Sequence, residues 1–201
     1  MAAPLRVSLS TSSVYPGTTA SGFEAASRLG YDGVEVMVGI DEVSTDAEAC
    51  LALSQFHEVP VVSVHAPTLL LTQRVWGTDP WGKLQRSAEM AHTVGASVVV
   101  VHPPFRWQRE YAKGFVEGIA ELEDEHGLVF AVENMYPWKA QVRGRNAGME
   151  MYLPGWDPSA EEYSHATIDL SHAAIAHDDV VEMARRLGDR LHHVHLTDGS
   201  G

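Results

Sequence analysis

Short apolar runs rich in valine alternate along the chain with longer stretches in which apolar residues recur every three or four positions. The short runs are typical of strands buried on both faces, and the longer stretches are typical of amphipathic helices. Regular alternation of the two predicts βαβ units and a parallel sheet. The predicted strands are residues 5–9, 33–38, 59–65, 98–102, 128–133, 167–170 and 191–197.

Local signals predict where the intervening helices begin. A helix is expected over 108–126, and Asp178 is expected to cap a helix that ends at Leu187. Residues 134–164 are expected to form a long loop with only a short helical turn near 159–163. The other predicted starts are the capping-box pairs Ser21–Glu24 and Thr45–Glu48 and the N-cap dipeptide Asp79–Pro80.

Seven strands, each but the last followed by a helix or loop, predict an α/β fold of the (β/α)8 TIM-barrel type. That barrel has eight strands and typically about 250 residues, whereas the sequence has 201. We therefore expect residues 1–201 to form one TIM-barrel domain that is incomplete, truncated after strand seven. A complete seven-stranded or open sheet is the alternative.

Histidine, glutamate and aspartate residues stand at the carboxyl ends of the third to seventh strands. Successive side chains of a strand point to opposite faces, so these polar residues are expected inside the barrel and their apolar neighbours against the helices. TIM-type barrels build their active sites at this end. The polar residues are His65, His102, Glu133, Asp169 and His195. The apolar neighbours are Phe130, Val132, Ile168, Leu170, Val194 and Leu196.

Imidazoles and carboxylates that converge predict a divalent-metal site. The mixture of oxygen and nitrogen donors suits Mn, Mg, Co or Zn and does not choose among them. Each histidine alone has an alternative role as a hydrogen-bonded structural residue. Six histidines lack this placement and are expected to be surface or structural residues: His57, His92, His126, His165, His177 and His192.

The loop after the fifth strand carries candidate substrate-binding residues. Arg143 and Arg145, with Lys139, have the charge to bind a substrate phosphate or carboxylate, and Trp138 and Trp156 have rings that cover a sugar face. A solvated loop, with the tryptophans as anchors, is the alternative.

Composition narrows the class of partner. The formal net charge of −13 opposes nucleic-acid binding, which needs a basic surface, and favours a small-molecule substrate. Cys50 is the only cysteine, which fits a reducing, cytoplasmic location. Neither a membrane span nor a secretory signal is expected, because the apolar runs are short and residues 1–14 hold no continuous apolar block. A homo-oligomer is compatible with all of this.

The strand-end segments together resemble the xylose-isomerase-like TIM-barrel superfamily. Its members include sugar phosphate isomerases and epimerases, inosose-type dehydratases and isomerases, and DNA-repair enzymes of the endonuclease IV type. The segments that carry the resemblance are Val64-His65-Ala66-Pro67, Val101-His102-Pro103, Val132-Glu133-Asn134, Ile168-Asp169-Leu170-Ser171-His172 and Val194-His195-Leu196-Thr197-Asp198.

The resemblance implies that Glu133, Asp169 and His195 are metal ligands. It further implies that His65 and His102 hold an additional metal in endonuclease-type members, and that His172 binds substrate or another metal. The family also uses a glutamate from strand eight, which this sequence lacks.

The leading functional interpretation is a metal-dependent isomerase or epimerase of a sugar or sugar phosphate. In it Glu133 takes a proton from carbon beside a carbonyl, and the metal stabilises the enediolate. The alternatives are a zinc phosphodiester hydrolase of the endonuclease IV type and a catalytically inactive barrel fragment.

Overall fold

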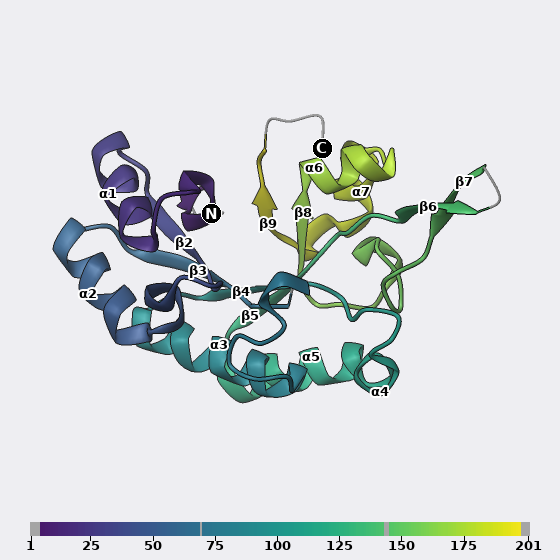
Figure 1. Ribbon diagram of the computed structural model, residues 1–201, viewed down its shortest axis with the longest axis horizontal. Helices are drawn as coiled ribbons and strands as arrows, with labels where there is room; N and C mark the ends of the chain where they lie inside the picture. The colour runs from purple at the N-terminus through teal and green to yellow at the C-terminus, as the bar shows by residue number, and fades with distance from the viewer. Residues whose placement is uncertain (1–4, 69, 143–144, 198–201) are drawn as a thin grey trace. The chain divides into compact units, whose positions relative to one another are not determined.

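The computed structural model describes residues 5–68, 70–142 and 145–197, with side chains outside the description over 139–148. Seven strands form one parallel sheet in the order β1-β2-β3-β4-β5-β8-β9, and β6 pairs with β7 in a separate two-stranded sheet (Figure 1). The large sheet therefore follows the order of the chain, as the TIM-type prediction requires. The chain divides into two compact units, one ending at Val99 and the other beginning at Val100.

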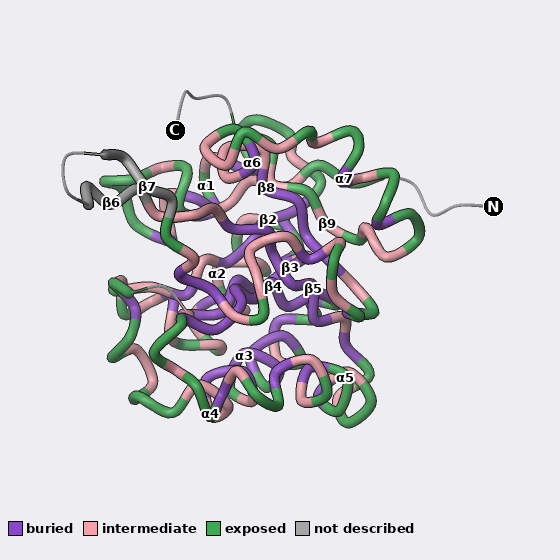
Figure 2. Tube along the Cα trace, turned by 90° about the vertical axis from the view of Figure 1, so that its right-hand side faces the viewer, coloured by how far each residue is buried: buried purple, intermediate pink, exposed green. Residues whose placement is uncertain are grey.

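The first unit contains three parallel strands and three long helices, with short 3-10 turns between them. Strands β1 and β2 pair from Ser8 with Gly33, and β2 pairs with β3 as far as Met37 with His65. In Figure 2 the strands β2 and β3 are largely buried. The strands are β1 (Ser8–Ser10), β2 (Gly33–Met37) and β3 (Val61–His65), the helices are α1 (Thr19–Leu29), α2 (Ala47–His57) and α3 (Pro80–Val94), and the 3-10 turns are η1 (Thr11–Val14), η2 (Glu42–Thr45) and η3 (Leu70–Thr72).

The first strand differs from its prediction. Leu5 and Val7, which were expected to be strand residues, are 92% and 56% exposed, and the strand begins only at Ser8. The apolar pattern of residues 5–9 therefore does not correspond to a strand that is buried on both faces.

Two predicted capping boxes are wrong by one or a few residues. Helix α1 is capped by Thr18, whose Oγ1 accepts a hydrogen bond from Ser21 N at 3.3 Å, so Ser21 is the third helical residue rather than the cap. Helix α2 is capped by Asp46 Oδ1, which accepts from Glu48 N and Ala49 N at 3.0 and 3.1 Å. In both cases another good capping side chain stands nearby, and sequence spacing alone does not rank them.

The third predicted helix start is confirmed. The two carboxylate oxygens of Asp79 accept hydrogen bonds from Trp81 N and Gly82 N at 3.2 and 3.1 Å, and Pro80 occupies the first turn of α3. The helix ends at Gly95, which has a φ of +76°. That left-handed conformation favours glycine.

The second unit carries three further parallel strands, and β4 contains the division between the units. Strand β8 pairs with β5 through Glu133 and Thr167, and with β9 through Asp169 and His195. The strands are β4 (Val98–Val101), β5 (Val129–Glu133), β8 (Ala166–Asp169) and β9 (Leu191–His195), with β6 (Trp138–Val142) and β7 (Arg145–Met149) forming the small sheet. The helices are α4 (Arg109–Lys113), α5 (Phe115–His126), α6 (Leu170–Ala176) and α7 (Val180–Leu187), and the 3-10 turns are η4 (Pro158–Ala160) and η5 (Gly188–Arg190).

Several predicted boundaries in this unit are corrected. The helix expected over 108–126 is interrupted at Gly114, a residue with low helix propensity, into α4 and α5. Helix α7 is capped by Asp179 rather than Asp178, since Asp179 Oδ1 accepts from Val181 N at 2.9 Å. The expected loop contains the antiparallel pair β6–β7, and α6 begins directly after β8.

The predicted packing of the apolar strand residues against helices is confirmed for β8 and is not found for β9 in the described residues. Ile168 is buried against Met183 and Leu187 of α7, with Leu170 packed beside them. Val194 is 48% exposed and Leu196 is 81% exposed. Strand β9 is the last strand of the sheet, and no helix follows it within residues 5–197 to cover that face.

The single cysteine is expected to be chemically inert in the folded chain. Cys50 is fully buried, and its Sγ donates a hydrogen bond to Val43 O at 3.2 Å. Burial, with smaller contributions from Asp46 and Asp41, raises the pKa of the Cys50 thiol to about 12. Because the thiolate is the reactive form, alkylation by iodoacetamide at pH 8 is expected to be roughly 100-fold slower in the native chain than in urea. Mass spectrometry measures both rates, and equal rates would contradict the buried position.

None of the helices in the described part of the chain is both long enough and apolar enough to cross a lipid bilayer.

Candidate metal centre

Glu133 ends β5 and is almost fully buried, with 1% of its surface exposed. Its Oε2 accepts a hydrogen bond from His102 Nε2 at 2.9 Å, and its Oε1 accepts one from His195 Nδ1 at 3.1 Å. Burial raises the pKa of the Glu133 carboxyl, but the charge of His102 and the hydrogen bonds from His102, His172 and His195 outweigh burial. The pKa of Glu133 is therefore held well below its ordinary value, and the residue is a carboxylate at neutral pH.

Asp169 ends β8 and uses its two carboxylate oxygens differently. Oδ1 caps α6 by accepting from His172 N at 2.9 Å, and it also accepts from Ser171 Oγ at 2.6 Å. Oδ2 lies 3.6 Å from His195 Nδ1. Burial raises the pKa of Asp169, but the hydrogen bond with His195 and the charge of His172 outweigh burial, so the net shift is downward. Asp169 therefore presents one charged oxygen toward His195 while the other supports the helix.

Glu133, Asp169 and His195 have donor atoms that suit a single cation. One donor atom from each residue lies within 4.8 Å of the other two. Ligand distances of about 2.0–2.2 Å place neighbouring donors about 3.0–3.6 Å apart. The separations of 3.1 Å from His195 Nδ1 to Glu133 Oε1 and 3.6 Å to Asp169 Oδ2 fall in that range. Two carboxylate oxygens and an imidazole nitrogen therefore fit a divalent ion in number, chemistry and spacing.

His172 lies beside this group but is oriented by a different contact. It is the third residue of α6. Its Nδ1 donates to Asn134 O at 2.9 Å and lies 3.3 Å from Glu133 Oε1. Burial lowers the pKa of His172, but the hydrogen bond and charge of Glu133 and the charge of Asp169 outweigh burial, so the net shift is upward. In the cationic form both ring nitrogens carry a proton, and Nε2 is a donor. The Tyr136 ring packs against the imidazole with the two ring centroids 5.1 Å apart.

Asn134 organises the ends of β5 and β8, a role that the sequence interpretation missed. The residue is fully buried. Its Oδ1 accepts from Asp169 N at 2.6 Å, and its Nδ2 donates to Asp169 O at 3.2 Å. The available signal was its position, directly after Glu133 in one of the family-like segments. Asn134 thus holds the backbone of Asp169 and, through its own carbonyl, the ring of His172.

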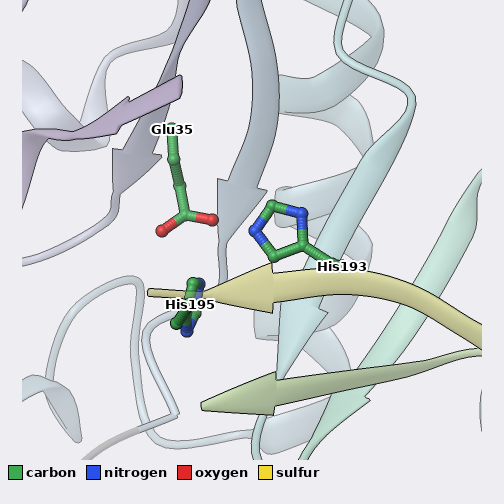
Figure 3. A group of neighbouring side chains, drawn as sticks. All are labelled: Glu35, His193 and His195. Atoms are coloured by element: carbon green, nitrogen blue, oxygen red, sulfur yellow. The ribbon is translucent and has the colours of Figure 1, made fainter. Parts of the chain in front are cut away.

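Two buried polar residues stand on strands of the first unit, the predicted ligand His65 and Glu35. His65 ends β3, is 1% exposed, and has Nδ1 at 3.2 Å from Ala66 O. Glu35 of β2, labelled in Figure 3, accepts a hydrogen bond from Ser63 Oγ at 2.9 Å. The roles of His65 and His102 as ligands of a further metal stay predictions.

Strand β9 presents two histidines on its less exposed face. His193 and His195 both project from this strand in Figure 3, and their rings meet edge to face with centroids 5.1 Å apart. The polar alternation predicted for this strand is therefore present, although its apolar partners are exposed.

The predicted substrate-binding residues of the loop are only partly described. Arg143 lies outside the described residues, and so do the side chains of Lys139 and Arg145. Trp138 packs against a cluster formed by Phe105, Met135, Met151 and Tyr152, as does Trp156. Both tryptophans therefore anchor this segment; a contact of Trp138 with substrate stays a prediction.

The family model described as xylose isomerase-like TIM barrel matches residues 23–201. The chain belongs to this family. The resemblance inferred from the strand-end segments is thereby confirmed, and so is the TIM-type fold class.

Two relatives show which kinds of protein are similar in sequence to this xylose isomerase-like chain. An uncharacterized protein of Mycobacterium leprae is 49% identical over 212 residues, which cover 98% of this chain and 76% of the relative. Fructoselysine 3-epimerase of Escherichia coli O157:H7 is 23% identical over 200 residues, covering 89% of this chain and 71% of the enzyme.

Solved structures of the family share the fold at low identity. A 3-keto-D-glucoside 4-epimerase from E. coli matches with a TM-score of 0.65 and 15% identity, over 97% of this chain and 80% of that enzyme. Endonuclease IV from Thermus thermophilus matches with a TM-score of 0.58 and 22% identity, over 98% of this chain and 78% of that enzyme. Because both classes of enzyme match, the fold by itself does not choose between them.

Proposed function

We propose that this chain is a divalent-metal-dependent epimerase or isomerase that acts on a sugar or sugar phosphate. The observation that carries the proposal is the convergence of Glu133, Asp169 and His195 at the ends of three neighbouring parallel strands. The epimerases among its sequence and structural relatives support the substrate class.

The donor set would hold the ion through Glu133 Oε1, Asp169 Oδ2 and His195 Nδ1, and the ion would take the place of the Nδ1 proton that Glu133 otherwise accepts. When bound, a divalent ion supplies positive charge that stabilises negative charge developing on a substrate oxygen. The identity of the ion among Mn, Mg, Co and Zn is left open by this mixed set.

Glu133 is assigned the proton transfer. Its lowered pKa keeps it ionised at neutral pH, so it begins the reaction able to accept a proton from carbon beside a carbonyl. Its second oxygen is held by His102 Nε2, which limits rotation of the carboxylate. His172 presents Nε2 toward a substrate hydroxyl, because its Nδ1 is engaged with Asn134 O. Trp138, Arg143 and Arg145 are proposed to contact the rest of the substrate.

A second candidate function is a zinc phosphodiester hydrolase. It is favoured by the imidazole of His102 on the far oxygen of Glu133, since a carboxylate between histidines can bridge metals. The net charge of −13 opposes a nucleic-acid substrate. Metal content separates the two: one ion per chain at the centre formed by Glu133, Asp169 and His195 supports the epimerase, and two or three zinc ions there support the hydrolase.

Proton exchange tests the proposed reaction directly. The chain, loaded with each of the four ions, is incubated in D2O with a panel of ketoses, 3-keto glycosides and their phosphates, and NMR follows deuterium at the carbon beside the carbonyl. We expect metal-dependent incorporation and epimer formation for at least one sugar. Cleavage of an abasic-site oligonucleotide together with no exchange in any sugar would overturn the proposal in favour of the hydrolase.

Asn134→Ala is expected to weaken binding of the ion by about 10–100-fold, the usual cost of losing a group that orients ligands. The substitution removes both side-chain hydrogen bonds to the backbone of Asp169. Competition with a fluorescent chelator measures the affinity, and a melting curve without metal reports the fold. Thr93→Ala, which removes a helix-surface hydrogen bond to Glu89 O, is the control. An Asn134→Ala chain with unaltered metal affinity would show that Asn134 only supports the fold.

A further inference from the structure

Two histidines and a glutamate lie together at the opposite ends of β8 and β9. His165 immediately precedes β8, and His192 is the second residue of β9. Asp169 and His195 follow them by four and three residues, so at about 3.3 Å per residue the two groups are roughly 10–13 Å apart. This group is therefore distinct from the candidate metal centre.

Glu123 of α5 orients the ring of His165. Its Oε1 accepts from His165 Nδ1 at 2.6 Å and from Phe130 N at 3.0 Å, and its side chain is only 11% exposed. With the proton held on Nδ1, a neutral His165 ring carries its lone pair on Nε2, on the side away from Glu123. A carboxylate that accepts from the distal nitrogen of a histidine is the usual support of a metal-binding imidazole.

His192 occupies an irregularity in the strand pairing. Ala166 pairs with Leu191, whereas the next residue, Thr167, pairs with His193, so His192 is the extra residue of a β-bulge. Bulges redirect side chains and recur beside functional sites. Here the His192 ring meets the His165 ring at an interplanar angle of 82°, with centroids 5.2 Å apart.

The spacing of the two rings is that of imidazoles sharing an ion. With nitrogen–metal distances of about 2.0–2.1 Å and a tetrahedral angle, the ring centroids of two ligands lie about 5 Å apart. The side chain of His165 is 31% exposed, which gives an ion access from solvent.

We propose that His165 and His192, supported by Glu123, bind a transition-metal ion of the zinc, nickel or copper class. The ion would link β9, the last strand of the sheet, to β8 at the ends remote from the candidate metal centre. Neutral imidazoles select this class of ion over Mg²⁺ and Ca²⁺, which prefer oxygen. This proposal does not depend on the proposed enzymatic function.

Zinc binding in a Glu133→Gln background tests the site, because that substitution removes a ligand of the other centre. Equilibrium dialysis against Zn²⁺ counts the bound ions, and NMR of the histidine side chains in the presence of Ni²⁺ shows which rings are broadened. The variants are His165→Ala, His192→Ala and Glu123→Gln, and His57→Ala of α2 is the matched control.

We expect the Glu133→Gln chain to retain one zinc, and either histidine substitution to abolish it while His57→Ala does not. Glu123→Gln should weaken binding by about tenfold or more. Melting curves without metal, equal for His192→Ala and its parent, establish that the fold is unaltered. Zinc stoichiometry that is the same with and without His192, or Ni²⁺ broadening that spares His165 and His192, would overturn the proposal.

Discussion

Replacing Glu133 with glutamine is expected to lower turnover of any sugar substrate by about 10²–10⁴-fold and to reduce metal content. Glutamine keeps the size of the side chain but removes the negative charge that faces His195 and His172 through Oε1. It also removes the group that we assign as the base. The rate is measured by deuterium exchange in D2O, and bound metal by elemental analysis.

Two further variants make the Glu133 result interpretable. His57→Ala, at the last residue of α2, should leave both rate and metal content unchanged. Asp169→Asn should reduce metal content while its rate at saturating metal falls less than that of Glu133→Gln, because Asp169 is assigned no proton transfer. A Glu133→Gln chain with normal exchange and normal metal content would contradict both assigned roles.

Replacing Lys83 with methionine is expected to destabilise the fold by about 2–3 kcal/mol. Lys83 of α3 is 4% exposed, and its ammonium donates to three backbone carbonyls, Pro67 O at 3.1 Å and Thr72 O and Gln73 O at 2.9 Å. Burial lowers the pKa of Lys83. Methionine fills similar space but leaves the three carbonyls of the segment after β3 without this donor.

Urea unfolding measures the loss, and Lys113→Met is the matched control. Lys113 is 71% exposed and pairs with Glu110 at 2.8 Å, so its replacement should alter stability by less than about 0.5 kcal/mol. Equal midpoints for the two variants would show that the carbonyls find other partners once the ammonium is gone.

The sequence predicted the parts of the fold that depend on repeated local pattern. The valine run of β4 and the alternation that ends at Glu133 and Asp169 are strong signals, because a buried parallel strand admits few other residues. The Asp79–Pro80 start was equally clear, since both residues act in the same first turn.

The errors fall where several residues compete or where distant packing decides. The cap of α2 is Asp46 rather than the predicted Thr45, because adjacent side chains can both accept a hydrogen bond from a helix N–H. Val194 is exposed because no described helix covers β9, which its apolar character cannot reveal. The hairpin β6–β7 has pairing partners within about a dozen positions but lacks a clear apolar alternation.

The sequence predicted the candidate ligands of the metal centre but not the residue that holds them in place. Strand ends bring Glu133, Asp169 and His195 together by topology alone. Asn134 contributes through contacts with the backbone of Asp169, 35 residues away, and no local pattern encodes that distance. Its place after Glu133 in a family-like segment was a sequence signal, but the contacts themselves emerge from the three-dimensional structure.

The two carboxylate oxygens of Asp169 have different contacts, so its structural role can be separated from its proposed chemical role. Oδ1 starts α6, and Oδ2 faces His195. Asparagine caps helices about as well as aspartate, so a chain with asparagine at this position would retain α6 while losing the negative charge beside His195. The helix at this position therefore does not depend on the charge that faces His195.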